Sequence, residues 1–406
     1  MTFEELYERI LKTHKIPDKN EYDPYHLDCL LHPEKHAVVV KNEPCDDVKC
    51  GKPCIKSCIF DAIDTDKNGE LKINKDLCTG CSACIDACKS GKLTGSRELI
   101  PAMKSVREEG KHAYALIAPA THGQFSEDVT PGMLRSAFKQ IGFTGMIEVA
   151  LFADILTLKE ALEFDAHVKR DTDFQLTSCC CPMWIAMIRK IYNELMPHVP
   201  AAVSPMVACG RVIKKLYPDA VTVFIGPCLA KKSEAKEKDI NDAIDFVLTF
   251  QEVQDIFDAA GVNVHEMEDI EKDHSSRGGR MYAVAGGVSE AVKSTLERIS
   301  PDRNIKIKTV TADGVSGCRE MIEKLKSGQI EGNFFEGMGC KGGCVGGPKS
   351  ILPTEVGKKH IENYVKQAVH YSPPENPYVT ELLKLIGINT INELIEKSDI
   401  FTRDFS

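Results

Sequence analysis

The chain has 406 residues, of which 43% are hydrophobic and 27% charged, with a formal net charge of −9 at pH 7. This balance is typical of a globular protein of two or three domains, and the acidic excess argues against nucleic acid as a partner, because phosphate binding needs a basic patch. No run approaches the roughly 18 uncharged residues that cross a bilayer, so we expect a cytoplasmic protein without membrane contact.

Cysteine is the unusual component, with 17 residues. In a reducing compartment, clustered cysteines bind metal or perform redox chemistry rather than form disulfides. Cys29, Cys209 and Cys318 stand alone and are interpreted as small buried hydrophobic residues. The distribution of the others divides the chain into a helical segment (1–37), a cluster-binding domain (38–95), a catalytic domain (96–350) and a C-terminal helical segment (351–406).

The first segment opens with a capping box, formed by Thr2 and Glu5, and places Phe3, Leu6 and Ile10 on one helical face. This pattern predicts an N-terminal helix. It does not indicate a function.

The segment "CTGCSACIDAC" has cysteines in the C-x2-C-x2-C-x3-C spacing of a 4Fe-4S ferredoxin loop, and "CDDVKCGKPCIKSC" upstream is a looser copy. The duplication resembles the two-cluster bacterial ferredoxins, which are small α+β domains. That resemblance implies two 4Fe-4S clusters with crossed ligation, so that each run lends its last cysteine to the other cluster. The two implied ligand sets are Cys45, Cys50, Cys54 with Cys88, and Cys58 with Cys78, Cys81, Cys84.

A zinc site, or no metal at all, is the alternative for these eight cysteines. Zinc sites come as two CxxC knuckles rather than as paired four-cysteine runs, so the spacing favours clusters. Neither Cys58 nor Cys88 is followed by the proline that is usual in ferredoxins. With clusters bound, this domain would transfer electrons one at a time.

Residues 96–350 alternate between short apolar runs and helical stretches. A helix is predicted from the N-cap Thr130 to Gly142. The alternation predicts an α/β domain with mostly parallel sheets covered by helices, whose ligands bind at the carboxyl ends of strands, where Cys228 lies. Buried strands are predicted at 112–120, 220–226, 245–250 and 280–286.

Three cysteine islands remain, "TSCCCPMW" (177–184), "IGPCLAKKSEA" (225–235) and "FFEGMGCKGGCVGGP" (334–348). Each places cysteine beside Gly or Pro, which let the backbone approach an inorganic cluster closely. Cys340 and Cys344 are one helical turn apart, which predicts that both sulfurs lie on one face. With Cys228 and one cysteine of the triple run they complete a four-thiolate site.

These islands resemble the three signature motifs of iron-only (di-iron) hydrogenases, over about 112 to 350. The resemblance implies an active site between two lobes and an H-cluster, a 4Fe-4S cube joined to a two-iron unit with carbonyl, cyanide and a bridging dithiolate. It implies reversible formation of H2 from two protons and two electrons. The implied cube ligands are Cys181, Cys228, Cys340 and Cys344, the proton-carrying thiol is Cys180, and Cys179 is either a packing residue or a direct participant.

Further roles follow from the same resemblance. Lys231 would donate a hydrogen bond to a cyanide ligand, Met338 would pack against the two-iron unit, and Ala118 and Pro119 would line the pocket. The alternatives are a solvated surface lysine at 231 and a core-filling methionine at 338.

The implied proton route runs through Glu160 and Glu163, which are three residues apart on one helix; the alternative is a solvated acidic face. The relay serine of the family would fall near Pro200 or Ala201 and its outer arginine near His167, and neither is kept.

Electrons would come from a soluble carrier, a ferredoxin or flavodoxin, and maturation proteins would install the two-iron unit. No glycine-rich dinucleotide loop follows a strand, so direct use of NAD would need another subunit. Residues 351–406 are expected to be helical and to pack on the catalytic domain. Two alternative functions stay open, a slow-turnover hydrogen sensor and a non-catalytic iron-sulfur assembly scaffold.

Overall fold

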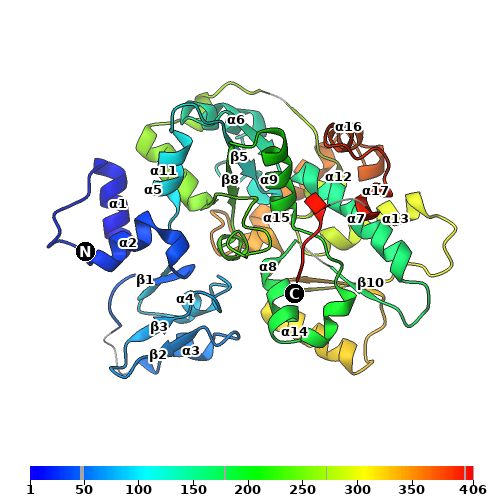
Figure 1. The fold of residues 1–406 in the computed structure, drawn as a ribbon, viewed down its shortest axis with the longest axis horizontal. Coiled ribbons are helices and arrows are strands. Elements are labelled where there is room, and N and C mark those ends of the chain that lie inside the picture. Colours follow the sequence, from blue (N-terminus) through cyan, green and yellow to red (C-terminus); the bar gives the residue numbers. More distant parts are fainter. Residues whose placement is uncertain (46–49, 178–179, 271, 397–398, 406) are drawn as a thin grey trace.

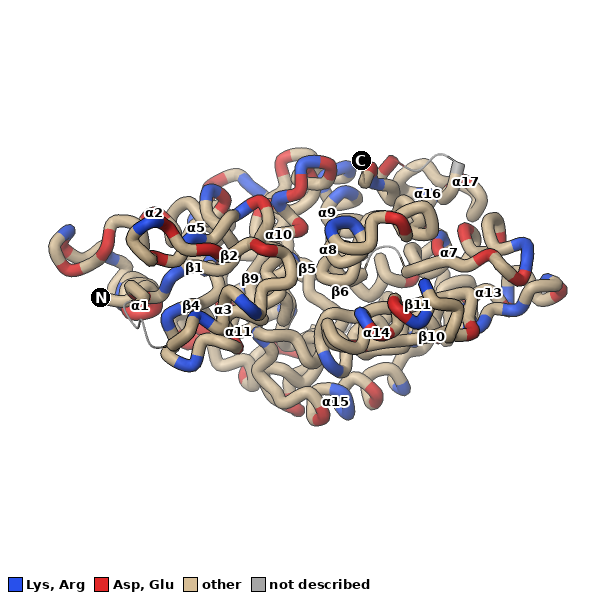
Figure 2. Tube along the Cα trace, turned by 90° about the horizontal axis from the view of Figure 1, so that it is seen from below, with Lys and Arg blue, Asp and Glu red and all other residues tan. Residues whose placement is uncertain are grey.

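The computed structural model describes residues 1–45, 50–177, 180–270, 272–396 and 399–405. Figure 1 shows helix α1 (Phe3–Thr13) at one end of the molecule and helix α16 (Pro377–Leu385) at the other. Acidic and basic residues are interspersed along the trace (Figure 2). Within the described ranges, no helix is long and apolar enough to span a bilayer.

The N-terminal segment forms two helices, α1 and α2 (Pro24–Leu31). The predicted capping box is confirmed: Thr2 Oγ1 accepts from the Glu5 amide at 3.2 Å, and the Glu5 carboxylate accepts from the Thr2 amide at 2.8 Å. The hydroxyl of Tyr7, on α1, donates to Asp255 at 2.9 Å. This bond attaches the N-terminal helix to the larger α/β part of the chain.

The cysteine-rich segment folds into two antiparallel strand pairs and two short helices that contact each other. Its elements are β1 (Val39–Lys41) paired with β4 (Leu93–Gly95), β2 (Ile63–Thr65) paired with β3 (Leu71–Ile73), α3 (Pro53–Lys56) and α4 (Ala83–Ala87). The core of this small domain combines cysteine side chains with a few apolar residues such as Val39, Leu71 and Leu93. Because so little apolar surface is available, its stability depends on what the cysteines bind.

A parallel sheet of four strands, in the order β6-β5-β8-β9, forms the first half of the α/β region. The strands predicted at 112–120, 220–226 and 245–250 are confirmed, whereas β6 was not predicted because only two of its residues are large and apolar. The strands are β5 (Ala113–Ile117), β6 (Gly145–Glu148), β8 (Val221–Gly226) and β9 (Phe246–Thr249). One face packs on α5 (Leu99–Val106), α6 (Pro131–Gln140) and α11 (Phe250–Ala260), the other on α7 (Ala150–His167) and α9 (Pro205–Leu216).

A second parallel sheet, in the order β10-β11-β7, lies in the other half. The strand predicted at 280–286 is wrong, because these residues end helix α12 (Arg277–Met281) and form the turns before α13 (Gly287–Ile299). Tyr282, inside this run, packs with Phe164 of α7 and Val288 of α13, so the run is apolar because it contacts helices. The strands are β7 (Gln175–Leu176), β10 (Thr309–Asp313) and β11 (Phe334–Met338).

Helix α7 contacts helices from both halves, α9 on one side and α13 on the other. It is buried along most of its length, including the carboxyl of Asp154. Burial raises the pKa of Asp154 to about 6, although hydrogen bonds act in the opposite direction. The donors are Ser276, through its amide and hydroxyl, Gly279 and Asn376, at 2.6–3.0 Å. One carboxyl therefore ties α7 to α12 and to the start of α16.

The C-terminal part is helical, with α15 (Thr354–Gln367), α16 and α17 (Glu393–Glu396). Both α16 and α17 contact α7, and α15 contacts α12. Beyond them, Arg403 donates to Glu237 at 2.6 Å and to Asp239 at 3.0 Å. The C-terminal segment thus packs on the α/β region.

Gly210 on α9 offers a test of this packing. A Cβ atom there would lie 2.2 Å from the Ala243 carbonyl oxygen, so Gly210→Ala should destabilise the protein by about 1–3 kcal/mol. The matched control is Gly317→Ala in α14 (Gly314–Lys326), where no heavy atom lies within 4 Å, and where alanine should stabilise by about 0.5–1 kcal/mol. Calorimetry measures both; an unchanged melting temperature for the first variant contradicts the packing described.

Candidate metal-cluster site

Four cysteines from three distant segments meet between the two sheets. Cys181 is the N-cap of α8 (Pro182–Lys190), Cys228 follows β8, and Cys340 and Cys344 follow β11. Each thus lies near the carboxyl end of a parallel strand or just after one, where ligands bind in such sheets.

The thiols lie close enough to affect one another electrostatically. Burial raises the pKa of Cys228 to about 11, and the Cys181 thiol acts in the same direction. Burial raises the pKa of Cys344 to about 12, with Cys181 and Cys228 adding to it. The pKa of Cys340 is also raised by burial and by these three neighbours. The four thiols therefore form one half-buried group.

This donor set fits an iron-sulfur cluster. Four neighbouring, half-buried thiolates would repel each other, so they need positive charge among them, which the irons of a cluster would supply. The Gly339 amide donates to Cys181 Sγ at 3.2 Å, and such amide bonds to sulfur are a usual feature of cluster sites.

The expectation that Cys340 and Cys344 share a helical face is wrong. Gly342 and Gly343, between them, have φ values of 78° and 91°, and only from Cys344 does a short 3-10 helix run. A Cβ atom at Gly343 would lie 2.5 Å from the Ala285 amide nitrogen. The glycines therefore allow a tight loop that packs against the backbone at 284–285, and this loop brings both sulfurs to the site.

A cavity of about 50 Å³ adjoins Cys228 and Cys344. It has few polar groups, as is typical of a ligand site that excludes water. Met338 does not line it but is buried in the apolar cluster that Cys180 and Cys344 contact. The lining residues are Ala118, Pro119, Val149, Cys180, Pro205, Met206, Phe224, Pro227, Cys228, Lys231, Tyr282 and Cys344.

Lys231 contributes a positive charge to the cavity wall. Its side chain is buried, so the alternative of a solvated surface lysine is wrong. Its ammonium donates to Glu234 at 2.6 Å within the short helix α10 (Ala230–Glu234). Burial lowers the pKa of Lys231, but Glu234, Cys228 and Cys344 together raise it above its usual value. The ammonium is therefore held charged beside the thiols.

Both relay candidates are buried on α7, with exposed fractions of 1% for Glu160 and 6% for Glu163, so the alternative of a solvated acidic face is wrong. Sequence analysis missed the neighbour of Glu163: the buried ammonium of Lys159 donates to its carboxylate at 2.5 Å. Cys180 lines the cavity, while Cys179 lies outside the described residues. The roles of these residues stay predictions.

In the small domain, the electrostatic neighbours of each cysteine follow the crossed grouping. Burial raises the pKa of Cys54, and the thiols that raise it further are Cys88 and Cys45. Burial also raises the pKa of Cys84, and there the neighbours are Cys81, Cys78 and Cys58. Cys45 has Cys50 and Cys88 beside it. The structure thus gathers the eight thiols into two sets, and their binding of clusters stays a prediction.

The two cysteine sites of the chain are adjacent. Cys81 is among the thiols that raise the pKa of Cys340. Cys81 and Cys181 also contact one apolar cluster. Ser233 donates to the Cys78 carbonyl at 3.1 Å, which fixes α10 to the small domain.

Among the described residues, no group of three or more His, Cys, Asp and Glu side chains converges tightly enough for a single metal ion. The sulfurs that hold a cube bind different irons and lie farther apart than zinc ligands. The isolated Cys29, Cys209 and Cys318 are fully buried, as predicted.

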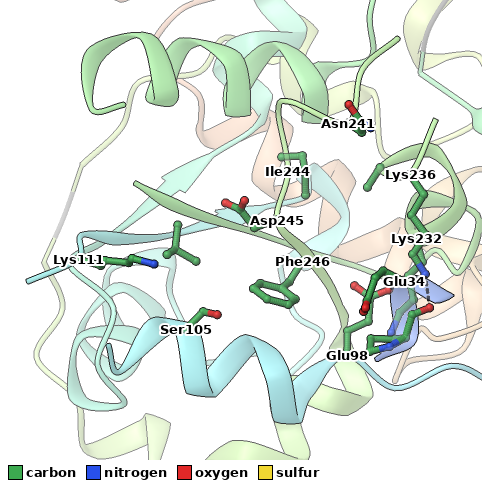
Figure 3. Close-up of a pocket in the computed structure, with 13 residues that line it drawn as sticks. Glu34, Glu98, Ser105, Lys111, Lys232, Lys236, Asn241, Ile244, Asp245 and Phe246 are labelled. Atoms are coloured by element: carbon green, nitrogen blue, oxygen red, sulfur yellow. Dashed lines mark hydrogen bonds and ion pairs between the residues drawn. The ribbon is translucent and has the colours of Figure 1, made fainter. Parts of the chain in front are cut away.

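A larger cavity of about 540 Å³ lies elsewhere, at the amino ends of β8 and β9 (Figure 3). Its charged groups have partners already: Lys232 bonds to Glu252 at 2.9 Å, and Asp245 to the Thr222 amide at 2.8 Å. It holds none of the cysteines. Its position at the wrong end of the strands argues against an active site there.

Comparison with known proteins agrees with this geometry. Residues 111–348 match the model of the family described as "Iron only hydrogenase large subunit, C-terminal domain", and residues 71–91 match "4Fe-4S binding domain". The FeFe-hydrogenase structure from Chlamydomonas reinhardtii superposes with a TM-score of 0.57 at 22% identity, covering 70% of this chain and 93% of that one. This likeness confirms the α/β fold.

Three curated relatives show a similar level of identity. Iron hydrogenase 1 of Clostridium pasteurianum is 26% identical, over 68% of this chain and 57% of its own length. The periplasmic Fe hydrogenase large subunit of Nitratidesulfovibrio vulgaris is 25% identical, over 71% of this chain and 88% of its own length. Cytosolic iron-sulfur assembly component 3 of Rattus norvegicus is 24% identical, over 77% of this chain and 80% of its own length. The present chain thus matches little more than half of the clostridial protein.

Replacing one proposed ligand tests the four-thiolate site. Cys340→Ala should lose one cluster, about four of about twelve irons in the reconstituted protein, because three thiolates hold a cube poorly. Iron and sulfide analysis measures the loss. Cys318→Ala, which alters a buried thiol that donates to the Met338 carbonyl at 3.3 Å, should keep all the iron. Equal iron content in the two variants contradicts the assignment.

Proposed function

The chain belongs to the iron-only hydrogenase large-subunit family, and from this premise we propose that it catalyses the reversible reaction 2 H⁺ + 2 e⁻ ⇌ H2. One observation carries the proposal. Two of the four cysteines of the three motifs, Cys228 and Cys344, line an apolar cavity that also presents the Cys180 thiol and the Lys231 ammonium. A cube alone would need only the four thiolates.

An H-cluster, held by Cys181, Cys228, Cys340 and Cys344, would supply the chemistry of H–H cleavage when bound. The chain provides binding and surroundings. Lys231, oriented by Glu234, can donate hydrogen bonds to anionic ligands such as cyanide. The wall of Ala118, Pro119 and other apolar residues excludes water.

Protons would pass between the cavity and solvent through Cys180, Glu160 and Glu163. The ammonium of Lys159 occupies one oxygen of Glu163, so protonation of that carboxylate must disturb a buried ion pair. The relay therefore includes a buried ion pair, and it lacks the serine and arginine of the family. This difference favours slow turnover, which supports the hydrogen-sensor alternative.

Electrons would enter through the small domain from a soluble carrier, a ferredoxin or flavodoxin. Because Cys81 lies beside Cys340, the cluster of Cys58, Cys78, Cys81 and Cys84 would be the one next to the active site. The other cluster would receive electrons first. Maturation proteins would supply the two-iron unit, and we place these steps in the cytoplasm.

The second candidate function is iron-sulfur assembly without catalysis. Its support is the 24% identity to cytosolic iron-sulfur assembly component 3, close to the values for the hydrogenases. A scaffold would bind cubes through the same cysteines. It would not need a thiol and an ammonium facing an adjoining cavity.

Infrared spectroscopy distinguishes the two functions. Protein prepared anaerobically with the maturation proteins should show carbonyl and cyanide stretching bands, because the proposal places a two-iron unit beside Cys344 and Lys231. Lys231→Met should weaken or shift the cyanide bands, since it removes the hydrogen-bond donor. A spectrum without either kind of band would exclude hydrogenase activity and leave the assembly function.

Cys180→Ala tests the proton carrier. The variant should keep its carbonyl and cyanide bands but lose at least about 100-fold in H2 evolution, because general acid-base groups contribute about 10²–10⁴ in rate. Cys209→Ala, at a buried thiol on α9, is the control and should retain the wild-type rate. Equal rates for the two variants would remove Cys180 from the mechanism.

A further inference from the structure

We propose that Leu229 is a positioning residue that holds the candidate four-thiolate site at a fixed distance from the small domain. The inference deepens the proposed function and rests on it, because it concerns the separation across which electrons reach the active site. The proposed cluster on the small-domain side is called the inner cluster, and its ligand set is Cys58, Cys78, Cys81 and Cys84.

The backbone of Leu229 touches the loop that carries the inner cluster. Leu229 follows Cys228 directly, is fully buried and precedes helix α10. A Cβ atom at Gly80 would lie 2.9 Å from the Leu229 carbonyl oxygen and 3.0 Å from the Cα atom of Ala230, so the two backbones are in close contact. Gly80 stands between two ligands of the inner cluster. The ligand loops of the two sites therefore meet at this residue.

The side chain of Leu229 makes a second contact, with the last residue of β4. A Cβ atom at Gly95 would lie 2.8 Å from Leu229 Cδ2 and 3.0 Å from Cδ1. The φ angle of Gly95 is not positive, so the contact with leucine, rather than the backbone conformation, favours glycine there. Gly80 and Gly95 thus leave space on the small domain, and Leu229 fills it.

Two hydrogen bonds from α10 reinforce this contact. The Ser233 hydroxyl donates to the Cys78 carbonyl at 3.1 Å. The Lys232 ammonium, which is fully buried, donates to the Ser96 carbonyl at 2.8 Å. Both acceptors belong to the small domain or to the residue that follows its last strand. The short segment after Cys228 is therefore bound to the small domain at several successive residues.

The location of the contact gives it a functional consequence. Ligands of both proposed clusters lie one or two residues from Leu229 or Gly80, so a change in the contact moves the two clusters relative to each other. The rate of electron transfer through protein falls steeply with distance. Leu229 would thus set the separation across which single electrons, supplied by the soluble carrier, leave the inner cluster and reduce the cube.

Leu229→Ala tests the proposal in the full chain with its 4Fe-4S clusters assembled and reduced. Electron paramagnetic resonance reports the magnetic interaction between reduced clusters, and the part that involves the cube is the difference from Cys340→Ala, which loses the cube. This part should weaken in Leu229→Ala, because the side chain that fixes the separation is gone. Leu229→Met, of similar volume, should restore it.

The matched control is Leu383→Ala, which truncates another buried leucine on α16, at the far side of the molecule from the small domain. It should lower the melting temperature but leave the magnetic interaction unchanged. An unchanged interaction in Leu229→Ala, with the iron content of the wild type, overturns the proposal.

A second position tests the same contact from the small domain. Gly80 and Gly91 have similar φ values, 71° and 67°, so alanine strains the backbone equally at both. A Cβ atom at Gly91 meets no heavy atom within 4 Å, whereas at Gly80 it must displace the backbone at Leu229. Gly80→Ala should therefore weaken the interaction and Gly91→Ala should not. Equal interactions in the two variants contradict the contact.

These results are separable from the proposed function. The magnetic interaction is measured without the two-iron unit, so a protein that shows no carbonyl or cyanide bands can still show the effect of Leu229. In protein that has the two-iron unit, Leu229→Ala should keep these bands and evolve H2 more slowly with reduced ferredoxin. Wild-type turnover in Leu229→Ala, with ferredoxin as the electron donor, would also overturn the positioning role.

Discussion

The fold depends on the compensation of charge among buried sulfurs. Cys181, Cys228 and Cys344 come from segments that end different strands, and burial makes the ionisation of Cys228 and Cys344 unfavourable unless positive charge lies among the sulfurs. A cluster held by these residues would join the two sheets. The same holds in the small domain, whose apolar core is too small to dominate its stability. Iron content and folding should accordingly be linked throughout the chain.

Helix α7 carries buried charged side chains near these sulfurs, where the proposed catalysis would use them. A helix buried on all sides is normally apolar, yet α7 carries Asp154, Lys159 and Glu163 inside the protein. Asp154 has four hydrogen bonds and is explained by the packing of α12 and α16. Among the residues that the structure describes, the side chains of Lys159 and Glu163 form no hydrogen bond except the one between them. Buried pairs of this kind rarely stabilise a fold, which favours a role in proton movement.

Features that depend on the spacing of neighbouring residues could be predicted from the sequence. The eight cysteines of the small domain and the strands at 112–120 and 220–226 could be predicted because their patterns are contiguous. The run 280–286 could not, because its apolar residues face helices rather than a sheet. Lys159 was missed although it stands four residues before Glu163, a spacing that pairs side chains on one helical face. The glycine pair at 342–343 was a usable signal for a loop between Cys340 and Cys344.

Membership of the family does not itself decide between catalysis and assembly, because both kinds of relative are about equally similar. The polar residues around the cavity are more informative than the cysteines. Burying Lys231 with Glu234 costs desolvation that the ion pair only partly offsets, and a leucine at 231 would satisfy a scaffold that binds a cube. The ammonium is better explained if an anionic ligand shares it.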